Sequence, residues 1–173
     1  MFLGPDTIPL DLLDENMRIH IELTQYEIEA IDDYDKYIQF QYRKNIVLTY
    51  YNYNDADGNW GTVSEHYVDT MDLQKIANCF RDLLSQKTDS FEYETVIDDI
   101  GNPFMVINCK RNEGKYSLKV QVSEGTFQEW LTVDLPNLSI GQINEYAQVF
   151  VRWAKDYLVL TAEELAIAKE VPW

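Results

Sequence analysis

The sequence predicts an α+β protein that is mainly antiparallel sheet with two amphipathic helices. Several segments alternate apolar and polar residues with the period of a half-buried strand, and short polar turns separate them. Two longer segments space their apolar residues three and four apart, which is typical of a helix with one apolar face. No βαβα alternation demands a parallel sheet, so the strands are expected to pair through short turns.

The first regular strand is expected at 17–23, where alternate apolar residues share one face. The apolar phase shifts after Thr24, and a bulge or a turn there would restore one apolar face. Residues 1–16 contain two prolines and are expected to be an irregular lead-in. Alternation returns at 37–42.

A hairpin and a helix complete the first half. Two runs rich in β-branched and aromatic residues, 46–53 and 60–68, flank Asp57-Gly58, a dipeptide typical of a tight turn. A helix is expected from Asp69 or Thr70 onward, and Gln86 begins its polar exit. Its apolar stripe consists of Leu73, Ile76, Ala77, Phe80, Leu83 and Leu84.

The second half follows the same order. Strands are expected at 91–97, 104–110, 116–122 and 127–135, and a helix is expected at 139–158. An offset of 70 residues superposes the apolar positions of the two helices, Leu73, Ala77, Phe80 and Leu83 on Ile143, Ala147, Phe150 and Trp153.

This order predicts one domain, 1–173, built from two half-repeats of strands, hairpin and helix at 17–88 and 89–160. The alternative is chance, because all amphipathic helices have an apolar stripe. Thr161 and Glu164 form a capping box, which predicts a short C-terminal helix.

The charge is strongly negative, with 30 acidic and 14 basic residues giving −16. Such a chain is expected to repel nucleic acid, and a basic protein is the expected partner. Residues 6–35 contain ten acids and one base. They form either a solvated face or a docking surface for that partner. The acids expected to bind it are Glu22, Glu27, Glu29, Asp32, Asp33 and Asp35.

Aromatic residues gather in the predicted hairpin. Tyr51, Tyr53 and Trp60 are the candidates for contact with a partner, because such side chains bury a large area with little loss of rotamer freedom. The alternative is ordinary cross-strand packing within the sheet.

The chain lacks the motifs of common catalytic and metal sites. It has only two histidines, His20 and His66, and neither lies in a zinc or nucleophile motif. No metal, cofactor or catalytic residue is therefore expected. Cys79 and Cys109 are expected to be reduced thiols, with a disulfide between them as the alternative. No apolar run is long enough to span a membrane and no signal peptide is evident, so a cytoplasmic location is expected.

Two segments resemble the WapI-type immunity proteins of bacterial contact-dependent toxin systems. They are the helix start at 69–80, which follows a strand, and the second passage from strands to helix at 116–158. The resemblance implies a non-catalytic inhibitor whose acidic face occludes a basic toxin, as a monomer or a homodimer. Two alternatives stay open: a scaffold or self-association domain that uses the aromatic hairpin, and an enzyme that uses a carboxylate pair.

Overall fold

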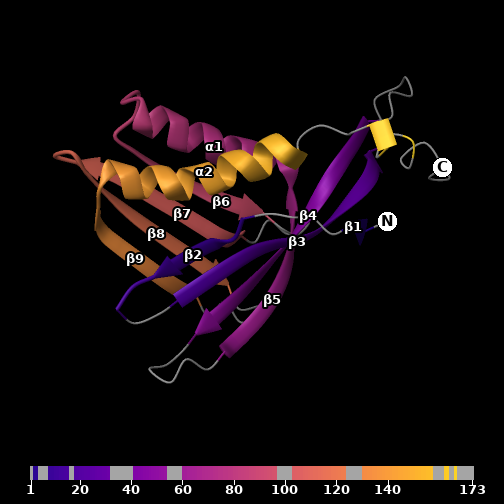
Figure 1. The fold of residues 1–173 in the computed structure, drawn as a ribbon, viewed down its shortest axis with the longest axis horizontal. Helices are drawn as coiled ribbons and strands as arrows, with labels where there is room; N and C mark the ends of the chain where they lie inside the picture. Colours follow the sequence, from indigo (N-terminus) through magenta and orange to yellow (C-terminus); the bar gives the residue numbers. More distant parts are fainter. Residues whose placement is uncertain are drawn as a thin grey trace.

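Two antiparallel sheets and two helices make up the described part of the chain (Figure 1). The computed structural model describes the backbone of residues 2–3, 8–15, 18–31, 41–53, 60–96, 103–123, 130–157, 162–163 and 166. It describes the side chains of residues 8–15, 18–21, 72–95, 105–122, 130–155, 162–163 and 166. The predicted α+β class is confirmed.

The first sheet is centred on β3, which pairs with β4 along one edge, while β4 pairs in turn with β5. Two short strands, β1 and β2, pair one after the other with the second edge of β3. A helix, α1 (Thr70–Leu84), follows this sheet. The strands are β1 (Phe2–Leu3), β2 (Leu10–Leu13), β3 (Arg18–Ile31), β4 (Gln41–Tyr53) and β5 (Trp60–Asp69).

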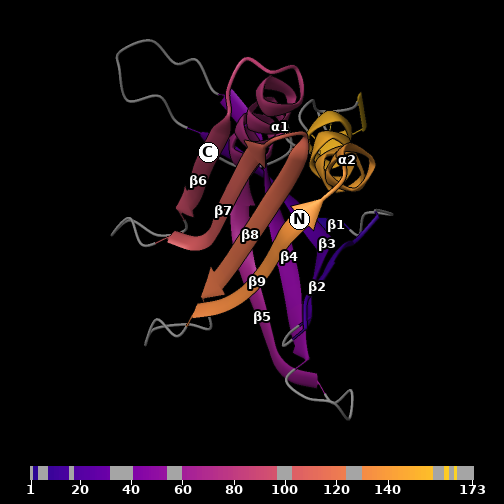
Figure 2. The ribbon, with the colours of Figure 1, turned by 90° about the vertical axis from the view of Figure 1, so that its left-hand side faces the viewer.

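The second sheet is a four-stranded meander in the order β6-β7-β8-β9 (Figure 2). A second helix, α2 (Ile140–Tyr157), follows it. Each sheet is therefore succeeded by one helix; whether the halves descend from a duplication stays a prediction. The strands are β6 (Ser90–Val96), β7 (Pro103–Asn112), β8 (Lys115–Ser123) and β9 (Trp130–Leu138).

The predicted bulge near Thr24 is confirmed. The register of β3 against β4 shifts between Leu23 and Gln25, so one extra residue lies in β3. Because side chains alternate along a strand, this residue resets the phase and lets one face continue across the whole strand.

The expectation of an irregular lead-in is wrong, because β1 and β2 lie within it. Leu10 and Leu12 are buried, 1% and 0% exposed, while Asp11 and Leu13 between them are exposed. This two-residue period decides the conformation, and Pro9 precedes the paired stretch instead of interrupting it. The expected strand at 37–42 and C-terminal helix lie largely outside the described residues.

Both helices bury the predicted stripe against one face of the second sheet. The four positions of α1 that correspond at an offset of 70 to positions of α2 are all buried, as are their counterparts. The helices run antiparallel across the sheet (Figure 1). The Phe80 ring stacks on Phe150 at 5.6 Å and meets Phe91 of β6 edge-on at 5.0 Å.

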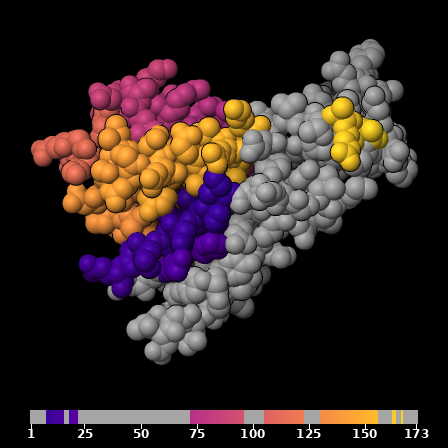
Figure 3. Space-filling view, in the orientation of Figure 1, coloured from indigo at the N-terminus to yellow at the C-terminus, as the bar shows by residue number. Residues whose placement is uncertain are grey.

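The N-terminal segment closes the other side of this core. Ile19 and Ile21 of β3, together with the buried leucines of β2, join the same apolar cluster as the helices. The indole Nε1 of Trp153 donates to the carbonyl of Ile8 at 3.0 Å, and the backbone N–H of Asp134 donates to Asp14 Oδ2 at 3.0 Å. Figure 3 shows the segment containing β2 beside α2.

Candidate functional site

The second sheet has one apolar and one polar face. Phe91, Cys109 and Leu118 share the register of the face that packs against the helices. The residues between them lie on the opposite, outer face, and most are exposed or half-buried. The polar side chains of this outer face are Ser90, Glu92, Glu94, Asn108, Lys110, Asn112, Lys115, Ser117, Lys119, Gln121, Thr132 and Asp134.

The register arranges these side chains in rows across the strands. One row joins Glu92, Asn108, Lys119 and Asp134 from β6 to β9. The next row ends with Gln121 and Thr132, whose side chains are joined by a 3.4 Å hydrogen bond. Neighbouring rows on one face of a strand are about 6.7 Å apart, the rise of two residues. The face is therefore a regular polar surface without a deep cavity among its described side chains.

The centre of this face carries local positive charge. Residues 103–123, which form the β7–β8 hairpin, contain four bases and one acid, a net charge of +3. Residues 1–69, which include the first sheet, contain fourteen acids and four bases, a net charge of −10. Three lysines of the hairpin, Lys110, Lys115 and Lys119, are exposed on the outer face. Phosphates would thus meet attraction here and repulsion elsewhere.

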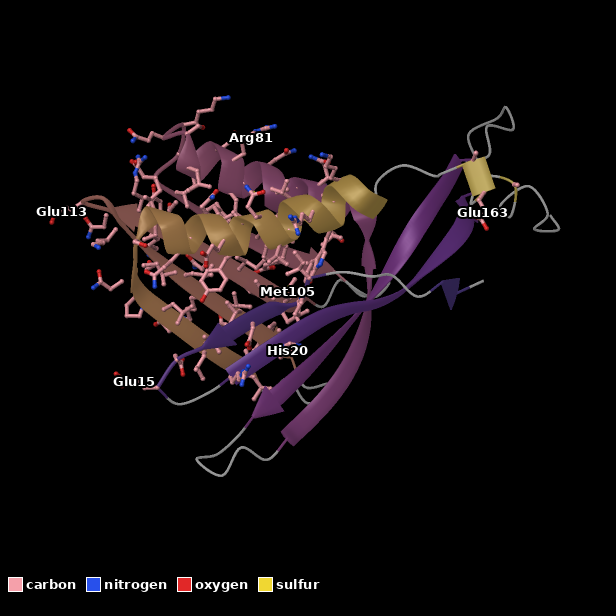
Figure 4. All side chains as sticks on the ribbon, viewed as in Figure 1. Glu15, His20, Arg81, Met105, Glu113 and Glu163 are labelled. Carbon is pink, nitrogen blue, oxygen red and sulfur yellow. The ribbon has the colours of Figure 1, made fainter. Side chains whose placement is uncertain are left out.

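The fourth base of the hairpin has a different role. Arg111 lies on the inner face beside the buried Tyr116, and its Nη2 donates to Asp89 Oδ1 at 2.6 Å. Its backbone N–H also donates to the Asp89 carbonyl at 2.8 Å. Arg111 thus fastens the start of β6 to the hairpin. Figure 4 labels Glu113 at the hairpin tip, two residues before Lys115, the first residue of β8.

An aromatic side chain lies at the end of the same face. Trp130 begins β9 opposite Ser123, in the register of Thr132 and Asp134, and is 36% exposed. Indoles are enriched at interfaces, and flat aromatic faces suit the stacking of bases.

The predicted acidic surface is only partly placed by the structure. The bulge in β3 brings Glu22, Glu27 and Glu29 to positions of one face, opposite Thr49, Asn45 and Arg43 of β4. Asp32, Asp33 and Asp35 lie outside the described residues. Their role in binding a partner stays a prediction.

Two other acids of the 6–35 segment are engaged within the protein. Arg18 donates to both carboxylate oxygens of Asp11, at 2.9 and 2.6 Å, and this pairing holds the pKa of Asp11 below its usual value. Asp14 accepts from the backbone of Asp134. Part of the segment's negative charge thus stabilises the fold.

The predicted aromatic residues occupy neighbouring register positions in the first sheet. Tyr51 and Tyr53 of β4 are the register partners of His20 and Arg18, and Trp60 of β5 is opposite Tyr53. They therefore lie on the face away from Ile19 and Ile21, the face that also holds the three glutamate positions of β3. Whether they contact a partner stays a prediction.

The thiol prediction is confirmed, since Cys79 and Cys109 are both free. Burial raises the pKa of the Cys109 thiol to about 12, which keeps it protonated. Among the described residues, no group of three or more His, Cys, Asp and Glu side chains is placed to hold a metal ion. None of the described helices is long and apolar enough to cross a membrane.

Two grooves border other elements, and the second of them reaches the outer face at Asp134. A groove of about 540 Å³ runs between α1 and α2 and is lined by Gln74, Phe80, Arg81 and Val151 among others. Another, of about 580 Å³, lies between the β2–β3 turn and β9 at Leu13, Asp14 and Pro136.

The outer face was not predicted from the sequence. The overall charge of −16 conceals the +3 hairpin, because a total averages over surfaces that face in different directions. A running count of charge would have located it, since Glu113 is the only acid between 103 and 123.

An α+β protein of two antiparallel sheets, each followed by a helix, is a known architecture. No family model and no curated protein matches the chain. Among solved structures it is similar to the plant transcriptional regulator PBF-2, with a TM-score of 0.50, 8% identity and coverage of 99% of this chain and 100% of that one. It is also similar to WHY3 from Arabidopsis thaliana, with a TM-score of 0.51, 8% identity and coverage of 95% and 96%. WHY1 from the same plant is similar with a TM-score of 0.51 and 7% identity, and the match covers 98% of this chain and 100% of that one.

This likeness corrects two predictions. Regulation of transcription takes place on nucleic acid, so the fold shared with PBF-2 contradicts the exclusion of nucleic acid as a partner. It also contradicts the predicted immunity-type inhibition of a basic toxin, and it gives no support to the scaffold and carboxylate-enzyme alternatives. The exclusion of nucleic acid was wrong because it applied the net charge of the whole chain to every part of its surface, including the positive β7–β8 hairpin. The resemblance to the WapI-type family itself is not tested by these comparisons.

Proposed function

We propose that the chain binds single-stranded nucleic acid on the outer face of its second sheet. The observation that carries the proposal is the +3 β7–β8 hairpin, whose three exposed lysines share a polar face within a protein of −16. The fold that the chain shares with a plant transcriptional regulator supports this proposal.

The shape of the face favours a single strand over a duplex. A duplex is read by an element that enters a groove, whereas this face is a sheet with one exposed indole at its end. Unpaired bases stack on such indoles while lysines contact the phosphates. The surrounding acids repel phosphate, which confines the strand to the hairpin.

The proposed role is binding without catalysis. A protein with a similar fold is a transcriptional regulator, and this likeness supports a binding role. We also propose a cytoplasmic location, which the two free thiols support because disulfides form in oxidising compartments.

Fluorescence anisotropy of a labelled single-stranded oligonucleotide tests the function. Because single strands give a slope of about −0.7 per neutralised phosphate, three lysine contacts predict a slope of log affinity against log salt near −2. Lys119→Gln should reduce the slope by about 0.7. Lys75→Gln removes an exposed lysine of α1, on the other side of the sheet, and should leave the slope unchanged.

Three results would reject the proposal. One is no binding at low salt. The second is an equal decrease of the salt slope in Lys119→Gln and Lys75→Gln. The third is a higher affinity for duplex than for single strands.

A further inference from the structure

The charges of the outer face are sorted by strand. The lysines lie on the two central strands, β7 and β8, while exposed carboxylates lie on the two flanking strands, as Glu92 and Glu94 on β6 and Asp134 on β9. Neighbouring strands are about 4.8 Å apart, so each carboxylate lies one strand away from the central pair.

This order fixes where the parts of a bound strand lie. Phosphates are attracted by Lys110 and Lys119 and repelled by the carboxylates on both sides, so the sugar–phosphate backbone follows the central hairpin. Bases then extend sideways, over the flanking strands. The groups that meet the base edges are therefore acceptors and not ammonium groups.

The amide side chains of the central strands are partly engaged by their neighbours on the face. Asn108 Nδ2 donates to Glu92 Oε2 at 3.5 Å, and Gln121 Nε2 donates to Thr132 Oγ1 at 3.4 Å. Each amide has one N–H group directed to a neighbour on the face, and it keeps one N–H donor and its carbonyl oxygen, so it can both donate and accept. The excess of acceptors beside the bases therefore comes from the carboxylates of β6 and β9, which when ionised can only accept hydrogen bonds.

From this arrangement, and resting on the proposed function, we infer that the outer face selects bases carrying an exocyclic amino group, with cytosine favoured over uracil and thymine. Cytosine presents an N4 amino donor where thymine and uracil present the O4 acceptor. A carboxylate accepts a hydrogen bond from the amino group. It forms no hydrogen bond with O4, because both groups are acceptors. One such contact corresponds to about a tenfold preference.

Competition between deoxycytidine and deoxyuridine oligomers of equal length tests the inference. The two bases are of similar size and neither carries a methyl group, so they differ only in the group at C4 and in N3, which is an acceptor in cytosine and an N–H donor in uracil. The full chain should bind the cytidine oligomer about tenfold more tightly. RNA oligomers of the same bases should give the same order, because the discriminating group is on the base.

Variants separate the inference from the proposed function. Glu92→Gln and Asp134→Asn introduce amide donors and should bring the cytosine-to-uracil ratio towards one, mainly by strengthening the binding of uracil. Lys119→Gln should weaken both oligomers equally and leave the ratio unchanged. Equal affinity of the unaltered chain for both bases, or a preference for uracil, overturns the inference alone. Failure to bind either oligomer rejects the proposed function.

Discussion

Phe80 of α1 and Phe150 of α2 form a stacked pair, with ring centroids 5.6 Å apart and an interplanar angle of 24°. The two residues occupy equivalent positions at the offset of 70 that relates the helices in sequence. Both are almost fully buried, 0% and 1% exposed. The Phe150 ring also meets Trp153 edge-on at 5.5 Å. The centre of the helix pair is therefore a continuous aromatic cluster that contacts β6 through Phe91.

Truncation of either ring should destabilise the fold strongly. Phe80→Ala or Phe150→Ala leaves a cavity in the core, and we expect a loss of about 3–5 kcal/mol in the free energy of unfolding. Denaturant titration measures it, with Phe80→Leu and Phe150→Leu as milder variants if the alanine proteins do not fold. A double-mutant cycle should show a coupling of about 0.5–1.5 kcal/mol, and additive losses would contradict a direct contact.

The Asp11–Arg18 pair should make stability depend on pH in the acid range. The hydrogen bond from Arg18 lowers the pKa of Asp11 from its ordinary value of 3.8. A lowered pKa contributes stability above the unfolded pKa, and this contribution is lost as pH falls through the folded pKa. Because the pair is exposed, Asp11→Asn should cost roughly 0.5–1 kcal/mol at neutral pH.

Denaturation of both proteins over the acid range checks this expectation. The difference between Asp11→Asn and the unaltered chain should shrink as pH falls below the ordinary pKa of 3.8, and it should vanish once Asp11 is protonated in the folded protein. Arg18→Gln should show the same dependence. A cost that stays constant as pH falls would instead indicate a packing effect.

The two thiols should react at very different rates. Burial and the charge of Asp82 raise the pKa of Cys79, which lies half-buried on α1. Cys109 is fully buried in β7, and its pKa of about 12 leaves almost no thiolate. An aromatic disulfide reagent should label Cys79 slowly in the native protein and Cys109 only on unfolding. Cys79→Ser should abolish native labelling, and rapid labelling of that variant would place Cys109 at an accessible site.

Trp130 should contribute to nucleic-acid binding by stacking. If the proposed function holds, Trp130→Ala should weaken single-strand binding by about 1–3 kcal/mol, because an indole–base stack is lost. Trp130→Phe should restore part of the affinity while changing neither the fold nor the charge. Quenching of the indole fluorescence that is present in the unaltered chain and lost in Trp130→Phe would identify this ring as the contact. Unchanged affinity in the alanine variant would exclude it.

Much of the fold was predictable because burial imposes a period on the sequence. The stripe from Leu73 to Leu83 and the bulge near Thr24 both follow from apolar spacing, and the structure confirms them. The β2 strand was missed because two alternating leucines are too short a signal beside two prolines. Its conformation depends on pairing with β3, which local sequence does not reveal.

The candidate site was much less predictable. Lys110 and Lys119 are nine residues apart in sequence, and only the pairing of β7 with β8 brings them to one face. The carboxylates of β6 and β9 come from still more distant segments. A surface built by register across four strands has no contiguous motif, and the total charge pointed to the opposite class of partner.

The contacts of Ile8 with Trp153 and of Asp14 with Asp134 join residues 145 and 120 positions apart. A growing chain therefore cannot complete its first sheet's packing until the last helix has been synthesised. Pairings so distant in sequence make folding slow, because loop closure precedes any gain from the contact. The N-terminal segment should thus be the last to gain protection during refolding, as pulsed hydrogen exchange at residues 10–21 would reveal. The leucines of β2 would spend that interval exposed to water, and the closing step would end the period in which the young chain is most prone to associate with others.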